Sequence, residues 1–350
     1  MKNFLSYFKR ENWMDPVGNS CRCDLKASEI SNSAGKKRAF AAVKWLSPRR
    51  GLRRSLGRPR RWDLICNAVK ILLLLGVTLL VSFPSHAGSI REVSRSIQQV
   101  QSIEPPFQFA IIGDSRDGEK VYSRLTQKIL ARKPAFMMHL GDMIPKPAEK
   151  EWQVFFEISK PISVPFFPVV GNHDVGTTRL GDEIYRKQFL LPEGRTYYAF
   201  RAGGTLFVIL DSEKGKGRII NEQWSWLEDV LSSSKEAFKF VFLHRPLFLP
   251  LDSLKTGRAM DKYPLERDNL HRLFLRSKVK GVFAGDDHRF DRREKDGILY
   301  LISGGGGAPL TALSDRGGYF HYVWISVLKD RIEGEVVDLE GSIQDKFVIE

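Results

Sequence analysis

From residue 107 to the C-terminus, short apolar runs alternate with segments whose hydrophobic residues recur at helical spacing. This alternation is typical of α/β proteins. The apolar runs predict strands over 107–112, 135–140, 164–170, 205–210, 238–243, 279–284 and 298–302. Two later runs, 319–328 and 331–339, predict a hairpin with Lys329 and Asp330 at its turn.

Helices are predicted where apolar residues return to one face every three or four positions. The two clearest stripes are Val121, Leu125 and Ile129, and Trp224, Leu227 and Leu231. Residues 88–105 predict a further short helix and a linker that ends in prolines. The linker leads into one domain over residues 106–350.

One apolar run differs from the others because arginines precede it. Residues 71–83 carry no charge, the basic run Arg49–Arg61 comes before them, and small residues up to Ala87 follow. This layout is typical of a secretory signal peptide cleaved after Ala87. Extending the run back to Ile65 gives roughly the 20 residues that span a bilayer, so an uncleaved anchor is the alternative for residues 62–87. We therefore expect an exported or periplasmic domain, attached to the inner membrane if the segment is uncleaved.

The formal net charge of +14 is confined to the first part of the chain. Residues 1–61 hold 16 Lys and Arg against 4 Asp and Glu, whereas residues 88–350 hold 38 against 36. The later part is nearly neutral, which argues against a nucleic-acid partner. We expect residues 1–61 to form a basic, disordered segment. A start codon assigned too early is the other explanation for so long a basic stretch.

All three cysteines, Cys21, Cys23 and Cys66, precede the domain. The domain therefore forms neither an internal disulfide nor a thiolate metal site. It also lacks the Gly-Lys-Ser/Thr of a P-loop and the G-x-S-x-G of serine hydrolases. The sequence therefore supports neither a P-loop nucleotide-binding site nor a serine hydrolase site of the G-x-S-x-G type.

Five of the predicted strands end in a polar cluster. The clusters are Gly113-Asp114-Ser115-Arg116, Gly141-Asp142, Gly171-Asn172-His173-Asp174, His244-Arg245-Pro246 and Gly285-Asp286-Asp287-His288. The carboxyl ends of strands in an open α/β sheet lie along one edge, so the clusters are expected to converge. Carboxylates, an amide and imidazoles without thiols are ligands for divalent metals such as Mn, Fe or Zn. A single Gly-Asp pair is common turn chemistry, but the ordered set is more specific.

The ordered series resembles the calcineurin-like metallophosphoesterase superfamily, whose motifs run D-x-H, GD, GNH(D/E), H and G-H-x-H. The resemblance covers about residues 106–310, and segments 222–227 and 303–310 are similar to the purple-acid-phosphatase-like branch. It implies an α/β fold in the form of a four-layer α/β/β/α sandwich. It also implies two divalent metal ions, about 3.5 to 4 Å apart, that activate a water for hydrolysis of a phosphate ester.

The resemblance assigns metal-binding roles to positions that match the motifs. Asp114 and His288 resemble ligands of the first metal. Asn172 and His244 resemble ligands of the second metal. Asp142 resembles the carboxylate that bridges both ions.

Two positions depart from the family pattern. Arg116 stands where many members carry a histidine ligand of the first metal, and Asp286 stands where the first His of G-H-x-H is expected. We expect Arg116 to contact a phosphate oxygen instead. Asp286 is expected to remain a metal ligand, because a carboxylate can replace an imidazole.

The resemblance also implies catalytic and substrate-binding groups. His173 resembles the group that protonates the leaving oxygen or steadies the transition state, with Asp174 as its orienting partner. Arg245 and Arg289 stand beside proposed ligands, so each either contacts phosphate or forms a salt bridge in solvent. The remaining histidines are expected to be structural: His139 and His321 in strands, and His271 on the surface of a helix.

The leading hypothesis is an exported, metal-dependent phosphoesterase that acts on a phosphorylated substrate. Arg116 and Asp286 prompt a first alternative, a degenerate member of the family that binds metal or phosphate without turnover. A second alternative is a membrane-associated interaction module in which the basic segment is the working part.

Overall fold

The structure is a computed structural model that describes residues 13–14, 20–21, 27–31, 37–41 and 90–350. The chain divides into two units, residues 1–80 and 81–350. The described residues of the first unit form two antiparallel pairs: β1 (Trp13–Met14) with β2 (Ser20–Cys21), and β3 (Ala27–Ser31) with β4 (Lys37–Ala41). The predicted signal or anchor at 62–87 lies outside the described residues. Within the described ranges, no helix is both long and apolar enough to cross a membrane.

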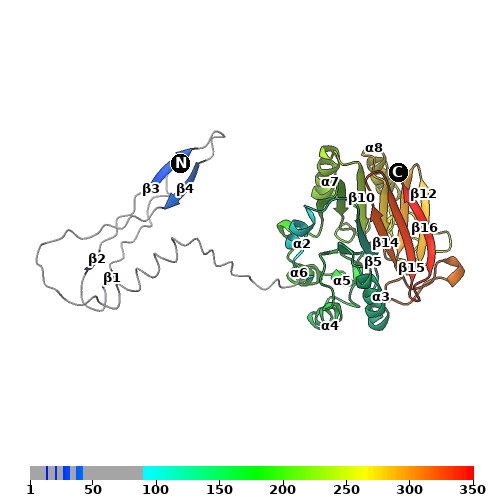
Figure 1. Ribbon diagram of the computed structural model, residues 1–350. Coiled ribbons are helices and arrows are strands. Elements are labelled where there is room, and N and C mark those ends of the chain that lie inside the picture. The colour runs from blue at the N-terminus through cyan, green and yellow to red at the C-terminus, as the bar shows by residue number, and fades with distance from the viewer. Residues whose placement is uncertain (1–12, 15–19, 22–26, 32–36, 42–89) are drawn as a thin grey trace, which may run out of the picture. The chain divides into compact units, whose positions relative to one another are not determined.

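The second unit is built on two six-stranded sheets (Figure 1). The first sheet has the order β16-β15-β14-β5-β6-β7. Its strands are β5 (Phe107–Ile112), β6 (Phe136–His139), β7 (Phe166–Pro168), β14 (His321–Val327), β15 (Ile332–Asp338) and β16 (Ile343–Ile349). β5, β6 and β7 are parallel, whereas β14, β15 and β16 add antiparallel strands to β5.

The second sheet has the order β12-β13-β11-β10-β9-β8. Its strands are β8 (Tyr198–Ala202), β9 (Thr205–Ile209), β10 (Phe238–Leu243), β11 (Gly281–Ala284), β12 (Phe290–Lys295) and β13 (Ile298–Ser303). The four central strands are parallel, and an antiparallel strand closes each edge. Parallel strands covered on both faces are near-continuous apolar runs, and β10 accordingly is buried along its whole length.

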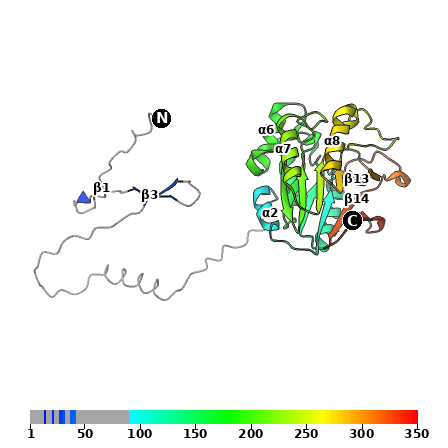
Figure 2. The ribbon, with the colours of Figure 1, turned by 90° about the horizontal axis from the view of Figure 1, so that it is seen from above.

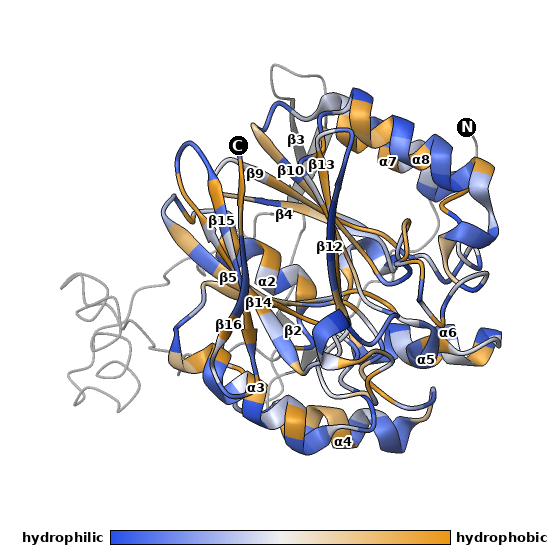
Figure 3. Cartoon of the chain, turned by 90° about the vertical axis from the view of Figure 1, so that its right-hand side faces the viewer, coloured by the Kyte–Doolittle hydropathy of each residue, from blue (hydrophilic) through white to orange (hydrophobic). Residues whose placement is uncertain are grey.

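Helices cover the outer face of each sheet, which completes the four-layer α/β/β/α sandwich (Figures 2 and 3). The helices are α2 (Val93–Val100), α3 (Glu119–Ala131), α4 (Glu149–Ser159), α5 (Asn172–Val175), α6 (Arg179–Gln188), α7 (Asn221–Ser233) and α8 (Pro264–Arg276). α7 and α8 bury Leu227 and Leu273 in an apolar cluster with the second sheet. α3 packs beside α4 and buries Leu125 and Ile129 in the larger cluster of the first sheet. The fold class expected from the resemblance is therefore confirmed.

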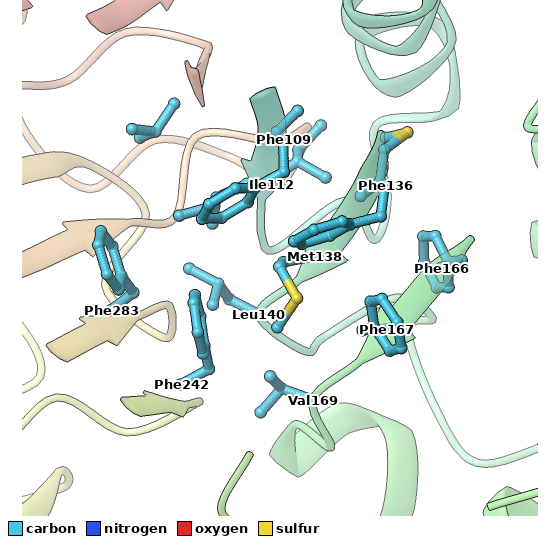
Figure 4. Packing of buried hydrophobic residues seen from close by; sticks show 14 of the residues in the cluster. Phe109, Ile112, Phe136, Met138, Leu140, Phe166, Phe167, Val169, Phe242 and Phe283 are labelled. Carbon is cyan, nitrogen blue, oxygen red and sulfur yellow. The ribbon is translucent and has the colours of Figure 1, made fainter. Parts of the chain in front are cut away.

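Aromatic rings fill the space between the two sheets (Figure 4). Phe207 of the second sheet is fully buried, and its ring centroid lies 5.4 Å from those of both Phe109 and Phe136 in the first sheet. Phe242 and Phe283 stack at 5.1 Å on the side of the second sheet. These contacts hold the sheets face to face, so the carboxyl ends of their parallel strands are fixed relative to each other.

The nine predicted strands are present, with ends that differ by up to a few residues. The two predicted helical stripes lie on α3 and α7. The short helix predicted within 88–105 is α2, which packs against β7 and β8 and buries Val93 and Val100. Three strands at or near the sheet edges, β8, β12 and β16, were not predicted from the pattern.

Candidate metal centre

The polar clusters converge, as predicted, at the carboxyl ends of parallel strands. Asp114 follows β5, Asp142 follows β6 and Asn172 follows β7 in the first sheet. His244 follows β10 and His288 comes after β11 in the second sheet. The site therefore takes side chains from both sheets and forms only when the two sheets are packed together.

The carboxylates leave their strands through left-handed backbone. Asp114, Asp142 and Asp286 have φ values of 58°, 55° and 65°. Aspartate tolerates this conformation better than most residues other than glycine. Gly285 precedes one of these turns, and a Cβ on it would stand 2.5 Å from Asp114 Oδ2. The turns therefore bring three carboxylates close together at a backbone cost that the rest of the fold must offset.

Three of the predicted ligands form a compact group. Single ligand atoms of Asp114, Asp142 and His288 all lie within 4.8 Å of one another, and all three residues are buried. In the part of the chain that the structure describes, no other three His, Cys, Asp or Glu residues meet this criterion. The three side chains predicted to hold the first metal are thus brought together from both sheets.

The atoms of this group are arranged to receive a cation. His288 Nδ1 donates to the Pro309 carbonyl at 2.8 Å, which leaves the Nε2 lone pair facing Asp114 Oδ1 at 3.6 Å. Burial lowers the pKa of His288, which favours the neutral ring. His288 Nε2 and Asp142 Oδ2 are buried without a hydrogen-bond partner. Two electron-rich buried atoms left in this way fit a divalent ion between them.

A second group surrounds His244. Its Nδ1 donates to the Leu140 carbonyl at 2.8 Å. Its Nε2 lies 3.2 Å from Asn172 Oδ1, 3.3 Å from Asp142 Oδ1 and 3.8 Å from Asp286 Oδ1. Burial alone would lower the pKa of His244, but the negative charges of these carboxylates and of Asp114 raise it to about 9. The predicted ligands of the second metal are therefore neighbours.

Lys255, which the sequence analysis did not identify, also enters the second group. Its Nζ lies 2.7 Å from Asp286 Oδ1 and donates a hydrogen bond to it. Burial alone would raise the pKa of Asp286, but the charges of His244 and Lys255 hold it below its usual value. Lys255 lies between β10 and α8, in a segment without a motif, so nothing in its sequence context indicated this position.

Arg116 lies at the rim of the first group, where it was predicted to meet a phosphate oxygen. Its Nε is 3.5 Å from Asp142 Oδ2, and its Nη1 donates to Asp117 at 2.5 Å. The Nε atom is buried and makes no hydrogen bond. The Nε–H group of Arg116 is therefore free to donate a hydrogen bond to a ligand in the site.

The predicted pairing of His173 with Asp174 is wrong. His173 Nδ1 lies 2.7 Å from the Pro145 carbonyl, and its Nε2 lies 3.9 Å from Asp142 Oδ2. Asp174 is fully buried and accepts instead from the backbone N–H groups of Gly171, Asp142 and Met143 at 2.8 to 3.0 Å. Asp174 therefore joins two site loops, and the Pro145 carbonyl orients His173.

Arg245 and Arg289 were expected either to contact phosphate or to form a salt bridge, and in the structure each forms a salt bridge. Arg245 forms a forked ion pair with the buried Glu213, with N–O distances of 2.8 to 3.0 Å. Arg289 pairs with Asp252 at 2.9 Å and lines a separate cavity with it. Both arginines stand beside ligands in sequence, but their side chains point to different neighbours.

An open cavity of about 670 Å³ adjoins the second group at Asn172. Four basic side chains that form no ion pair with another residue of the described part of the chain line it: Lys214, Lys216, Arg258 and Lys262. The three acidic residues at its wall have other partners: Asp182 pairs with Arg186, Glu213 pairs with Arg245, and Asp211 accepts hydrogen bonds from Thr196 and from backbone N–H groups. The cavity therefore presents a net positive charge next to the candidate metal centre.

The other histidines lie apart from these groups. His139 and His321 are buried strand residues, as predicted. His271 is also buried, with Nδ1 2.6 Å from the Tyr300 hydroxyl and Nε2 2.8 Å from Asp296, so its predicted surface position is wrong. The helix that carries it faces the second sheet at this residue.

His321 is expected to make the fold sensitive to acid. Burial lowers its pKa to about 4, whereas the unfolded chain keeps a value near 6.5. As the pH falls from about 6.5 to 4, the unfolded state binds the proton first, so the free energy of unfolding should fall by about 3 kcal/mol through this group. Urea unfolding of the wild type and of His321→Asn over this range isolates the contribution. Equal acid sensitivity of the two proteins would contradict it.

The fold and the grouped carboxylates and imidazoles define a class of protein, the metal-binding phosphoesterases built on two packed sheets. The chain belongs to the calcineurin-like phosphoesterase family, whose model matches residues 107–290. The serine/threonine-protein phosphatase CPPED1 of Homo sapiens is 28% identical over 174 residues, which are 45% of this chain and 54% of that protein. CPPED1 of Danio rerio is 29% identical over 221 residues, 57% of this chain and 69% of that protein. The match thus spans about half the length of the human relative.

Solved structures show the same fold at lower sequence identity. Purple acid phosphatase PPD1 from yellow lupin (Lupinus luteus) seeds superposes with a TM-score of 0.61 at 18% identity, over 70% of this chain and 54% of that chain. GAP50, the anchor in the inner membrane complex of Plasmodium, gives a TM-score of 0.55 at 14% identity, over 70% and 88% of the two chains. The expected membership of the metallophosphoesterase family is confirmed, and the likeness to a purple acid phosphatase is confirmed for the fold.

Proposed function

We propose that this protein is an exported, divalent-metal-dependent phosphoesterase. The observation that carries the proposal is the group of Asp114, Asp142 and His288, with unsatisfied buried ligand atoms on two of the three. A divalent ion bound there supplies a Lewis acid and an activated water for attack on phosphorus. The family resemblance implies two such ions, and the unsatisfied atoms support the first site directly.

The chain's own residues would bind the phosphate and provide the proton. Arg116 has a free buried Nε directed at the site and suits a phosphoryl oxygen. His173 donates from Nδ1 to the Pro145 carbonyl, so its Nε2 faces the site, and the imidazolium form of the ring would give its Nε2 proton to the leaving oxygen. The cationic cavity beside Asn172 would accept the leaving group. Its four basic residues favour a substrate with additional negative charge near the ester.

Export is part of the proposal and rests on residues 62–87. The arginine-rich flank, the uncharged apolar run and the small residues that end at Ala87 support a signal peptide or anchor. The family domain would then meet its phosphorylated substrate outside the cytoplasm. A reporter enzyme that works only in the cytoplasm can be fused after residue 340. Activity of this fusion protein would contradict export.

Hydrolysis of p-nitrophenyl phosphate and of bis-p-nitrophenyl phosphate by the purified chain tests the activity. We expect the protein to hydrolyse at least one of the two esters. Chelation should abolish this activity, and addition of Mn²⁺ or Zn²⁺ should restore it. Hydrolysis that is unaffected by chelation would contradict the proposal.

His173→Ala is expected to slow turnover by about 100-fold, since it removes the proposed proton donor. The metal content should stay that of the parent, because His173 lies outside the compact group of ligands. Steady-state kinetics and elemental analysis of one preparation measure both quantities. A variant that loses metal as well as activity would show that the histidine supports the ion instead.

A family member that binds metal or phosphate without turnover is the second candidate. Two observations favour it: Arg116 replaces an expected imidazole, and Lys255 forms an ion pair with Asp286 at the second site. Binding of phosphate without hydrolysis of any ester tested would support this candidate.

A further inference from the structure

We propose that Lys255 takes the place of a second metal ion, so that the centre binds one divalent ion, at Asp114, Asp142 and His288. The inference builds on the proposed metal-dependent hydrolysis and concerns how this chain supplies the positive charge. It arises from a disagreement: the family resemblance implies two ions, whereas the Lys255 ammonium is hydrogen-bonded to Asp286, next to the side chains expected to hold the second ion.

The first step is the ion pair itself. Lys255 Nζ lies 2.7 Å from Asp286 Oδ1, and the Asp286 side chain is 2% exposed against 18% for Lys255. The pair is therefore largely withdrawn from water, where a charge-assisted hydrogen bond is stronger and loss of one partner is costly. Lys255 thus neutralises the Asp286 carboxylate within the folded chain.

The second step is the loop that delivers the lysine. Ser253 Oγ donates to the buried Asp287 at 2.6 Å and accepts the Lys255 backbone N–H at 3.0 Å. Thr311 Oγ1 donates to the other oxygen of Asp287 at 2.7 Å. Asp287 anchors the loop and directly follows Asp286. The anchor of the loop is therefore the sequence neighbour of the carboxylate that pairs with Lys255. The ammonium is positioned by this arrangement.

The third step is where the ammonium stands. Asp286 Oδ1, its acceptor, is also 3.8 Å from His244 Nε2. His244 Nε2 in turn lies 3.2 Å from Asn172 Oδ1 and 3.3 Å from Asp142 Oδ1. Asn172, His244 and the bridging Asp142 are the set that the resemblance assigns to the second ion, and Asp286 lies beside them. A divalent cation among them would lie close to a like charge that is already hydrogen-bonded to one of its ligands.

The first site differs in this respect, although Arg116 is near it. Arg116 Nε is 3.5 Å from Asp142 Oδ2 and makes no hydrogen bond to it. Asp142 Oδ2 and His288 Nε2 both remain without a partner. At the second site, Asp286 Oδ2 also lacks a hydrogen-bond partner, but an ion bound there would share this carboxylate with the Lys255 ammonium on Oδ1. Among the described residues, no such hydrogen-bonded cation stands on the ligand atoms of the first site.

The test is the number of ions bound by the purified full chain, stripped of metal and titrated with Mn²⁺ or Zn²⁺ alone. Calorimetry and elemental analysis after desalting should give one ion per chain. Lys255→Met should raise this to two, because it frees Asp286. Lys150→Met, at an exposed position of α4, is the matched control and should remain at one. Two ions in the wild type, or one in Lys255→Met, would overturn the inference.

Asp286→Ala keeps the inference testable if Lys255→Met does not fold. With one ion at the first site, Asp286→Ala should keep the wild-type number of ions. A centre that uses Asp286 as a ligand should lose one. Aryl phosphate hydrolysis by the same samples separates the two proposals: one ion without turnover overturns the proposed function alone, and two ions with turnover overturn the role of Lys255 alone.

Discussion

Asp142→Asn is expected to lower phosphoesterase activity by more than about 100-fold. Asp142 Oδ1 accepts from the His173 backbone N–H at 2.8 Å, and its Oδ2 is buried without a hydrogen-bond partner beside His288 and Arg116. Asparagine keeps the shape and one acceptor but removes the negative charge on which a bound cation depends. Initial rates with p-nitrophenyl phosphate, at saturating metal, measure the loss.

The matched control for this prediction is Asp229→Asn, on the exposed side of α7. It makes the same chemical change far from the site in sequence and should leave the rate unchanged. Circular dichroism of both variants should match that of the parent. An Asp142→Asn protein that is folded and retains most of the activity would show that this carboxylate is not needed for the reaction.

Phe207→Ala is expected to lower the free energy of unfolding by about 4 kcal/mol. Phe207 is fully buried, and besides its contacts across the sheets its ring stacks on Phe200 with centroids 4.8 Å apart. Truncation removes apolar area and leaves a cavity between two sheets that cannot close fully around it. Urea unfolding followed by tryptophan fluorescence measures the change.

A comparison with Leu265→Ala tests whether burial causes this loss. Leu265 is 75% exposed at the start of α8, so its truncation should change stability by less than about 0.5 kcal/mol. Activity should disappear in the same transition as fluorescence, because the two sheets carry parts of one site. Activity that persists at urea concentrations above the fluorescence transition would contradict the conclusion that both sheets contribute to one site.

The sequence predicted the interior of the fold better than its edges. β5 and β10 match their predicted ranges, since a strand buried on both faces is a continuous apolar run. β12 reads Phe-Asp-Arg-Arg-Glu-Lys and lies at a sheet edge, drawn blue along its length in Figure 3. Its side chains are polar and only partly buried or exposed, and Arg292 and Arg293 pair with Asp345 and Asp291, so no hydrophobic pattern indicates the strand.

The site shows a similar division. Asp114, Asp142 and His288 could be predicted because each follows a recognisable strand, and strand ends meet at an edge. The direction of a side chain is set by tertiary neighbours instead. Asp174 accepts hydrogen bonds from backbone N–H groups, and Arg289 forms an ion pair with Asp252, although both residues adjoin site residues in sequence. Lys255 reaches the site through a loop held by Asp287, and no local pattern records that contact.

The origin of the three grouped ligands has a thermodynamic consequence. Asp114 and Asp142 extend from one sheet and His288 from the other, so a bound ion would tie the sheets together and bind the unfolded chain far less well. By linkage, free metal at 100 times its dissociation constant would add about 2.7 kcal/mol to the free energy of unfolding. The persistence of the folded protein would then depend on the supply of metal in its compartment as well as on its sequence.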